Sequence, residues 1–159
     1  MNKKGFTLME LLIVVVLISG FAAMTYPSYK ISLERARASE AVSMVGAIKA
    51  AEEKHFVSYE EYGSTYHDIN DFEPGIENAN FDPNSSSFNT EYFRYTIVAG
   101  QKKVQASRIK NGVMINKGYR IDGFFEERFI RCVVTNNDGD KVCTSLTDKD
   151  KVGDYYPIF

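Results

Sequence analysis

The chain has no tryptophan, only two histidines and two cysteines, and no excess of basic residues. Its 19 lysines and arginines are outnumbered by 21 aspartates and glutamates, so the formal net charge is -2. A nucleic-acid-binding protein needs a basic surface that neutralises phosphates, and this balance offers none. We therefore predict no nucleic-acid partner.

The sequence also lacks the patterns that carry enzyme or cofactor chemistry. It has no glycine-rich phosphate-binding loop, no series of metal ligands and no convincing pair of nucleophile and base. Solvated positions at a helix end and in a loop explain His55 and His67 better than a metal site does. We predict a protein that is not an enzyme and that holds no cofactor or metal.

The two cysteines, Cys132 and Cys143, lie close together near the C-terminus. An even number of cysteines beside an export-type N-terminal segment favours a disulfide formed in an oxidising compartment. The bridge would staple the turn-rich residues 136–140 and contribute about 2–3 kcal/mol through loop-closure entropy. The Asn/Asp cluster in that segment lacks the ligand series of an EF-hand, so a plain acidic turn is favoured over a calcium site.

What the chain does contain is a long apolar N-terminal segment. Lys3 and Lys4 precede residues 6–26, a stretch that suits a hydrocarbon core about 30 Å thick and predicts a single span with a cytoplasmic N-terminus. Its one charged residue is Glu10. A carboxylate within a membrane-spanning stretch costs about 2.5–3.5 kcal/mol. Some other group should therefore pair with Glu10.

Two ordinary interpretations leave that carboxylate unexplained. A secretory signal would use Lys3 and Lys4 as its basic region, residues 11–18 as its apolar core and Gly20-Phe21-Ala22 as a small-residue cleavage site. Such signals are uniformly hydrophobic where this chain has an acid. A plain anchor explains the topology of the chain but gives the acid no role. Both interpretations stay open as alternatives.

The run Lys4-Gly5-Phe6-Thr7-Leu8-Met9-Glu10 resembles the leader and cleavage junction of type IV prepilins and of the related type II secretion pseudopilins. The apolar residues that follow, and Pro27, are similar to the rest of that family's first helix. The resemblance implies that residues 1–5 are a leader, that a prepilin peptidase cuts after Gly5, and that Phe6 becomes the methylated N-terminal residue.

Such a cleavage would create the group that the buried acid needs. The new α-amino group of Phe6 has a pKa of about 7.7–8.0, so much of it is charged near neutral pH. If subunits stack by one axial step, this cation neutralises Glu10 on a neighbouring chain, and a misregistered packing leaves a charge bare. We therefore predict Phe6, Glu10 and Pro27 as assembly residues.

Residues 6–27 are predicted to form the membrane-spanning or filament-core half of one long helix, and residues 28–56 its amphipathic half. Pro27 lacks an N–H donor and should kink or loosen the helix between them. Apolar residues from Ala38 to Ala51 recur every three or four positions, which predicts a stripe that docks on the chain's own sheet. Lys49 is expected on a solvent-facing side.

Residues 57–91 carry turn signals and are predicted to connect the helix to a sheet, and residues 92–159 to form an antiparallel sheet and a disulfide-bounded C-terminal region. Asn111-Gly112 is the best hairpin turn. Four strands are predicted, at residues 92–99, 102–109, 113–121 and 128–135. The expected fold class is α+β, with a long N-terminal helix packed on a four-stranded antiparallel sheet, as in pilins.

These features predict a structural subunit, a pilin that is stored in the inner membrane and polymerised with copies of itself by pilus or secretion assembly machinery. The cysteine pair and the long loop favour an extracellular pilus, and the sequence leaves adhesion, motility, DNA uptake and secretion open as its purpose. One alternative is a pseudopilin, which builds a short periplasmic structure. An alternative of another class is a signal-anchored periplasmic binding domain, for which Glu10 would be incidental.

Overall fold

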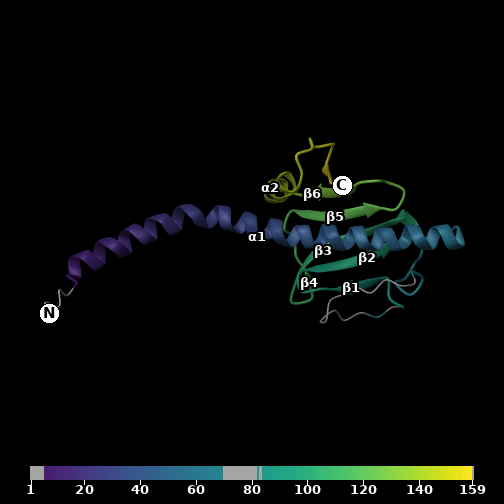
Figure 1. The fold of residues 1–159 in the computed structure, drawn as a ribbon, viewed down its shortest axis with the longest axis horizontal. Helices are drawn as coiled ribbons and strands as arrows, with labels where there is room; N and C mark the ends of the chain where they lie inside the picture. The colour runs from purple at the N-terminus through teal and green to yellow at the C-terminus, as the bar shows by residue number, and fades with distance from the viewer. Residues whose placement is uncertain (1–5, 70–81, 83, 159) are drawn as a thin grey trace, which may run out of the picture. The chain divides into compact units, whose positions relative to one another are not determined.

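The computed structural model describes residues 6–69, 82 and 84–158. The chain divides into two compact units, Met1–Leu33 and Glu34–Phe159, which are described separately below. One helix, α1 (Leu8–Tyr59), supplies the described helical residues of the first unit and the first element of the second (Figure 1).

Helix α1 is continuous over 52 residues. It begins directly after Thr7, and it ends where Glu60 takes a left-handed conformation with a φ of 59°. The expected loosening at Pro27 is not found, because the helical backbone runs through this residue. Pro27 removes only its own N–H from the ladder, and the helical backbone on either side of it is kept.

The second unit is built on one antiparallel sheet in the order β1-β2-β3-β5-β6-β7, with β4 paired to the outer end of β3. The strands are β1 (Ser87–Asn89), β2 (Phe93–Val98), β3 (Lys103–Lys110), β4 (Val113–Met114), β5 (Tyr119–Phe124), β6 (Ile130–Val134) and β7 (Tyr155–Ile158). A short 3-10 turn, Ala99–Gln101, joins β2 to β3. The α+β class is as predicted, but the described residues form a sheet of seven strands and not four.

The predicted third strand, residues 113–121, is two strands in the structure. Between β4 and β5 the chain turns at Gly118, whose φ is 82° and whose N–H donates to the Asn116 side chain over 2.8 Å. A Cβ on Gly118 would lie 1.7 Å from Asn136 Oδ1, so this turn also needs the space that glycine leaves. By contrast, Asn111 and Gly112 form the predicted tight turn, with φ values of 53° and 78°.

The two remaining strands are short and lie at the edges of the sheet. β1 has three residues and pairs with β2, and β7 has four and pairs with β6. β7 contains Pro157, which a sheet tolerates only on an edge strand, where its missing N–H interrupts no ladder. Segments this short give too little alternation to be recognised as strands from sequence.

The helix stripe packs on the sheet as predicted. Ala38, Ala41, Val45 and Ile48 are fully buried in one cluster with Phe93, Tyr95, Ala106 and Ile121 of the central strands. Figure 1 shows this part of α1 crossing one face of the sheet. The helix lies close to β5, because a Cβ on Gly123 would be only 2.5 Å from Val45 Cγ1.

Candidate assembly site

The first unit presents apolar side chains that contact little of their own chain. Leu8 is 84% exposed, Val14 47% and Ile18 62%, and the other large apolar side chains along this segment are similarly open. Monomeric soluble proteins rarely expose apolar surface of this extent. By length and composition, α1 is able to cross a membrane. This segment therefore needs lipid or other chains around it.

The carboxylate of Glu10 is held by a capping box at the start of α1. Thr7 donates to Glu10 Oε2 from both its backbone N (2.8 Å) and its Oγ1 (2.7 Å). In return, the Glu10 N–H donates to Thr7 Oγ1 over 3.2 Å. Such a reciprocal pair satisfies amide donors that the first helical turn otherwise leaves open. The single chain thus hydrogen-bonds Glu10 but supplies no cation to neutralise it among the described residues of this unit.

The other residues predicted for processing and assembly are Gly5, Phe6 and Pro27, and they do not all lie together. Gly5 lies outside the described residues. Phe6 immediately precedes Thr7, and its side chain is 82% exposed. Pro27 is inside α1. Phe6, Thr7 and Glu10 therefore share the N-terminal end of the helix, and Pro27 lies about five turns further along it.

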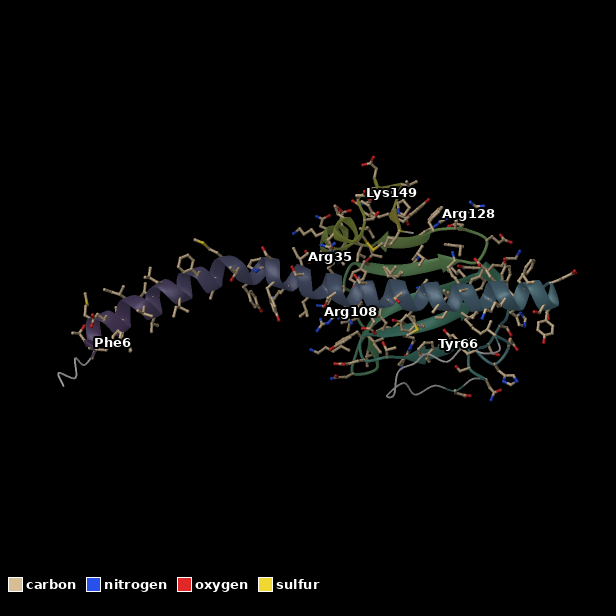
Figure 2. The ribbon with its side chains drawn as sticks, in the orientation of Figure 1. Phe6, Arg35, Tyr66, Arg108, Arg128 and Lys149 are labelled. Carbon is tan, nitrogen blue, oxygen red and sulfur yellow. A yellow bond between two sulfur atoms is a disulfide. The ribbon has the colours of Figure 1, made fainter. Side chains whose placement is uncertain are left out.

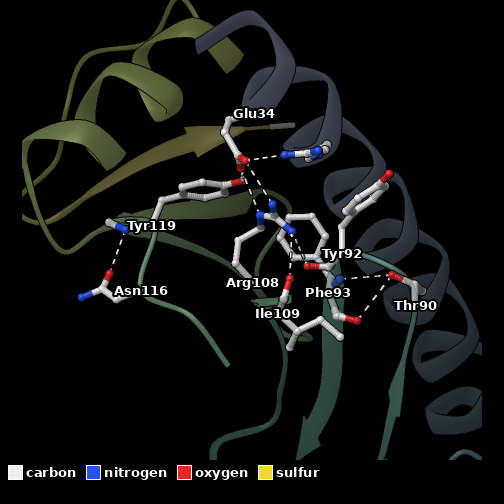
Figure 3. Close-up of polar contacts among 10 residues, drawn as sticks. Glu34, Thr90, Tyr92, Phe93, Arg108, Ile109, Asn116 and Tyr119 are labelled. Carbon is white, nitrogen blue, oxygen red and sulfur yellow. Dashed lines mark hydrogen bonds and ion pairs between the residues drawn. The ribbon is translucent and has the colours of Figure 1, made fainter. Parts of the chain in front are cut away.

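At the start of the second unit, a polar cluster fastens α1 to the sheet (Figure 3). Arg108 on β3 donates from Nε and Nη2 to the two carboxylate oxygens of Glu34, each over 3.0 Å. Tyr119 on β5 donates to the same carboxylate over 3.2 Å, and Arg37 donates over 2.7 Å. Burial acts to raise the pKa of Glu34, but the hydrogen bonds and charges of Arg108 and Arg37 outweigh burial and lower it. Glu34 is therefore a charged anchor between helix and sheet.

Two ionisable residues are buried nearer the end of α1. Lys49 is 6% exposed, and its Nζ donates to the backbone oxygens of Glu127 and Phe129. Its expected solvent-facing position was wrong, and burial lowers its pKa. Glu52 is fully buried and accepts from the Gly63 N–H over 2.9 Å. Burial raises the pKa of Glu52 to about 7, against the lowering effect of that hydrogen bond.

The C-terminal region contains a disulfide between Cys132 on β6 and Cys143 on α2 (Asn137–Leu146). The expected acidic turn at residues 136–140 is instead the first part of this helix. Asn136 caps it by accepting from the backbone N–H groups of Asp138 and Gly139, both over 3.0 Å. The helical pattern was obscured by a run of turn-forming residues that here serves as an N-terminal cap.

Polar side chains of the Asn/Asp cluster and of the end of α1 have partners within the chain. Asp140 accepts from Lys151 over 2.7 Å and from Tyr156 over 3.3 Å. His55 Nδ1 lies 2.8 Å from the Glu61 carbonyl oxygen. Within the described part of the chain, no group of three or more histidine, cysteine or acidic residues is placed to hold a metal ion.

The sequence is similar to those of known proteins. Residues 1–26 match the family described as "Prokaryotic N-terminal methylation motif". A fimbrial protein of Neisseria meningitidis serogroup A is 30% identical over 112 residues, which is 70% of this chain and 53% of the relative. A fimbrial protein of Pseudomonas aeruginosa is 41% identical over 63 residues, or 40% of this chain and 41% of the relative. By this motif and these matches, the chain is similar to type IV pilins.

A further relative is the type IV major fimbrial protein FimA of Dichelobacter nodosus, 45% identical over 47 residues. That match covers 30% of this chain and 29% of the relative. The chain spans about half, or less, of the length of these curated pilins.

Sequence reasoning missed several residues that hold this fold together. The capping box was readable, since Thr7 and Glu10 have the Ser/Thr-x-x-Glu/Gln spacing of that motif. The contact of Glu34 with Arg108 had no such signal, because the two residues are 74 positions apart. The burial of Lys49 and Glu52 likewise depends on which loops cover the end of α1.

Proposed function

We propose that this chain is the structural subunit of a type IV pilus and polymerises through the N-terminal half of α1. Residues 6–27 are the filament-core half of that helix, and residues 28–56 the half that joins the sheet. The observation that carries the proposal is the exposed apolar surface of the first unit, with Glu10 capped at its N-terminal end. The matched methylation motif and the fimbrial relatives support the same conclusion.

In this proposal the chain is first a membrane-anchored precursor. Lys3 and Lys4 remain on the cytoplasmic side of the inner membrane, and the sheet domain lies outside. A prepilin peptidase removes residues 1–5, and assembly machinery then moves the apolar segment of α1 from lipid into a bundle of identical helices. The disulfide suits the oxidising compartment that the sheet domain then occupies.

Cleavage after Gly5 changes the electrostatics of Glu10. The capping box already supplies hydrogen bonds to one carboxylate oxygen, but Thr7 carries no charge. The new α-amino group of Phe6 on a neighbouring chain supplies the missing cation. The charge of Glu10 therefore determines how neighbouring chains align, and the cap determines how the carboxylate is held.

Two substitutions separate these roles. Glu10→Gln keeps an oxygen that accepts from Thr7 but removes the charge, and Glu10→Val removes both. If charge pairing sets the register, both variants insert into the membrane and neither yields normal fibres in the fraction sheared from cells. Normal fibres from Glu10→Gln would contradict charge pairing and leave Glu10 with a capping role alone. Asp150→Asn, which removes one carboxylate charge at an exposed position of the other unit, is the control for expression and export.

Mass analysis of the mature N-terminus tests the processing step. The expected product begins at Phe6 and carries one added methyl group. A product that begins near Met24 would instead support cleavage of an ordinary secretory signal. Detection of this chain only in the periplasm, with no sheared surface fibres, would favour a pseudopilin over a pilin.

A further inference from the structure

Charged side chains without ion-pair partners gather at two opposite ends of the unit Glu34–Phe159. At the end where α1 begins in this unit, Arg35, Lys110 and Lys117 are exposed and form no ion pair with any described residue. Figure 2 shows Arg35 and Arg108 at this end, and Figure 1 shows β4 and its hairpin there. The opposite end contains the last turn of α1 and the β5–β6 connection.

The first of these ends contains a cleft of about 340 Å³. We call it the basic cleft, and its charged lining is Arg37, Arg108, Lys110 and Lys117 with Glu34 and Glu91. Glu34 already accepts from both arginines. The open part of the cleft therefore takes its positive charge from Lys110 and Lys117. Glu91 is the one carboxylate of the lining that is not paired with these arginines. A carboxylate-rich partner fits this surface.

The opposite end offers such carboxylates. Glu53, Glu60 and Glu61 are exposed and form no ion pair within the described part of the chain, and together we call them the acidic tip. Backbone hydrogen bonds hold the tip in place. The Glu60 N–H donates to the Phe56 carbonyl over 2.8 Å, and the Glu61 carbonyl oxygen lies 2.8 Å from His55 Nδ1. The last turn of α1 contains no basic residue, so the negative end of the helix dipole adds to the tip.

Other charges at this end cancel the tip only in part. Lys102 is paired with Glu126 over 2.7 Å, which neutralises both. Lys54 and Arg128 are exposed cations, and Asp68 adds a further carboxylate, so four carboxylates stand against two cations. A surface with a cationic cleft at one end and carboxylates at the other is suited to a head-to-tail contact between identical chains. A two-fold axis across α1 would also pair tip with cleft, but it would make the two chains antiparallel, which the parallel register of the proposed filament does not allow.

We propose that the acidic tip of one copy of this chain contacts the basic cleft of a second copy further along the filament. This contact rests on the proposed pilin function, in which register set at Phe6 and Glu10 keeps all subunits parallel. Glu34 and Glu60 are separated by about 39 Å along α1 at 1.5 Å per residue. Two parallel copies displaced by about that distance bring tip and cleft together.

Charge reversal and rescue test the contact. Each variant of the full chain is made in cells that contain no other version of this protein. Lys110→Glu/Lys117→Glu and Glu60→Lys/Glu61→Lys should each reduce sheared fibres by about tenfold, since like charges then meet in the interface. The four substitutions combined should restore fibres toward the wild-type yield. Lys141→Glu/Lys149→Glu, which makes the same change in net charge as the lysine reversal but on and after α2, should leave the yield unchanged.

A second measurement uses unmodified fibres. A zero-length carbodiimide joins amines to carboxylates only where they touch, so it should link Lys110 or Lys117 to Glu60 or Glu61. The distance along α1 excludes this link within one copy. Normal fibres from both reversed variants, or no rescue by the combined variant with no such cross-link, would overturn the contact while leaving the pilin function intact. Absence of fibres from the wild-type chain would overturn both.

Discussion

Arg108 on β3 donates two hydrogen bonds of 3.0 Å each to the carboxylate of Glu34 on α1, which is 74 residues away in the sequence. The same guanidinium also donates to the Tyr92 carbonyl, so it joins the helix to two neighbouring strands. A bidentate pair of this kind has a fixed geometry that a lysine cannot reproduce. The pair fixes the helix on the sheet at the point where α1 enters the second unit.

Arg108→Ala should therefore lower the free energy of unfolding by about 2–4 kcal/mol, because Glu34 stays largely buried with only Arg37 and Tyr119 as partners. Arg108→Lys should recover part of this loss. Denaturant unfolding of the full chain in detergent micelles, followed by near-UV circular dichroism, measures the difference. Equal stability of the alanine variant and the wild type would show that the pair contributes nothing.

The same pair predicts a loss of stability in acid. The pKa of Glu34 is lower in the folded protein than in the unfolded chain, so its contribution is complete above about pH 4.5 and declines as the pH falls through the folded pKa. Glu34→Gln should flatten this acid-side decline. A decline of unchanged slope in this variant would assign it to other carboxylates.

Folding shifts the pKa of Glu52 in the opposite direction, upward. Its pKa rises from 4.5 to about 7 on folding, so between those values the folded chain holds a proton that the unfolded chain has lost. The free energy of unfolding should therefore fall by about 3 kcal/mol as the pH rises from 4.5 to 7. Glu52→Gln keeps an acceptor for the Gly63 N–H and should remove this dependence, leaving the variant more stable than the wild type at pH 8. Unfolding curves at pH 5, 6, 7 and 8 give the comparison.

The large features of the fold were readable from sequence because they depend on local pattern. The stripe that starts at Ala38 gave the docking face of α1, and Asn111-Gly112 gave a hairpin turn. β7 and α2 were missed, because four residues that include Pro157 and a helix that opens on Asn136 look locally like loops. Glu34 and Glu52 were missed for a different reason, since their partners are set by tertiary packing that no local pattern encodes.

Reduction of the disulfide should loosen α2. Cys132 and Cys143 are both fully buried, and their bond ties α2 to the central part of β6. Cys132→Ser/Cys143→Ser should lower the free energy of unfolding by about 3 kcal/mol in reducing-agent-free buffer. Hydrogen exchange should rise first in α2, with less change in β2 and β3. The wild-type chain treated with a reductant is the matched control, and equal stability before and after reduction would contradict the prediction.

The close approach of α1 to β5 gives a test of packing. A methyl group at Gly123 would lie 2.5 Å from Val45 Cγ1 and 2.9 Å from Lys49 Cδ, and Val45 has no open space to move into because it is fully buried. Gly123→Ala should therefore destabilise the fold by about 1–3 kcal/mol. Gly123→Ala combined with Val45→Ala makes room for the added methyl group, so the loss from the double change should be smaller than the sum of the two single losses. Gly100→Ala, where nothing lies within 4 Å, is the control and should change stability little. Additive losses in the double variant would show that the helix and β5 do not meet at this point.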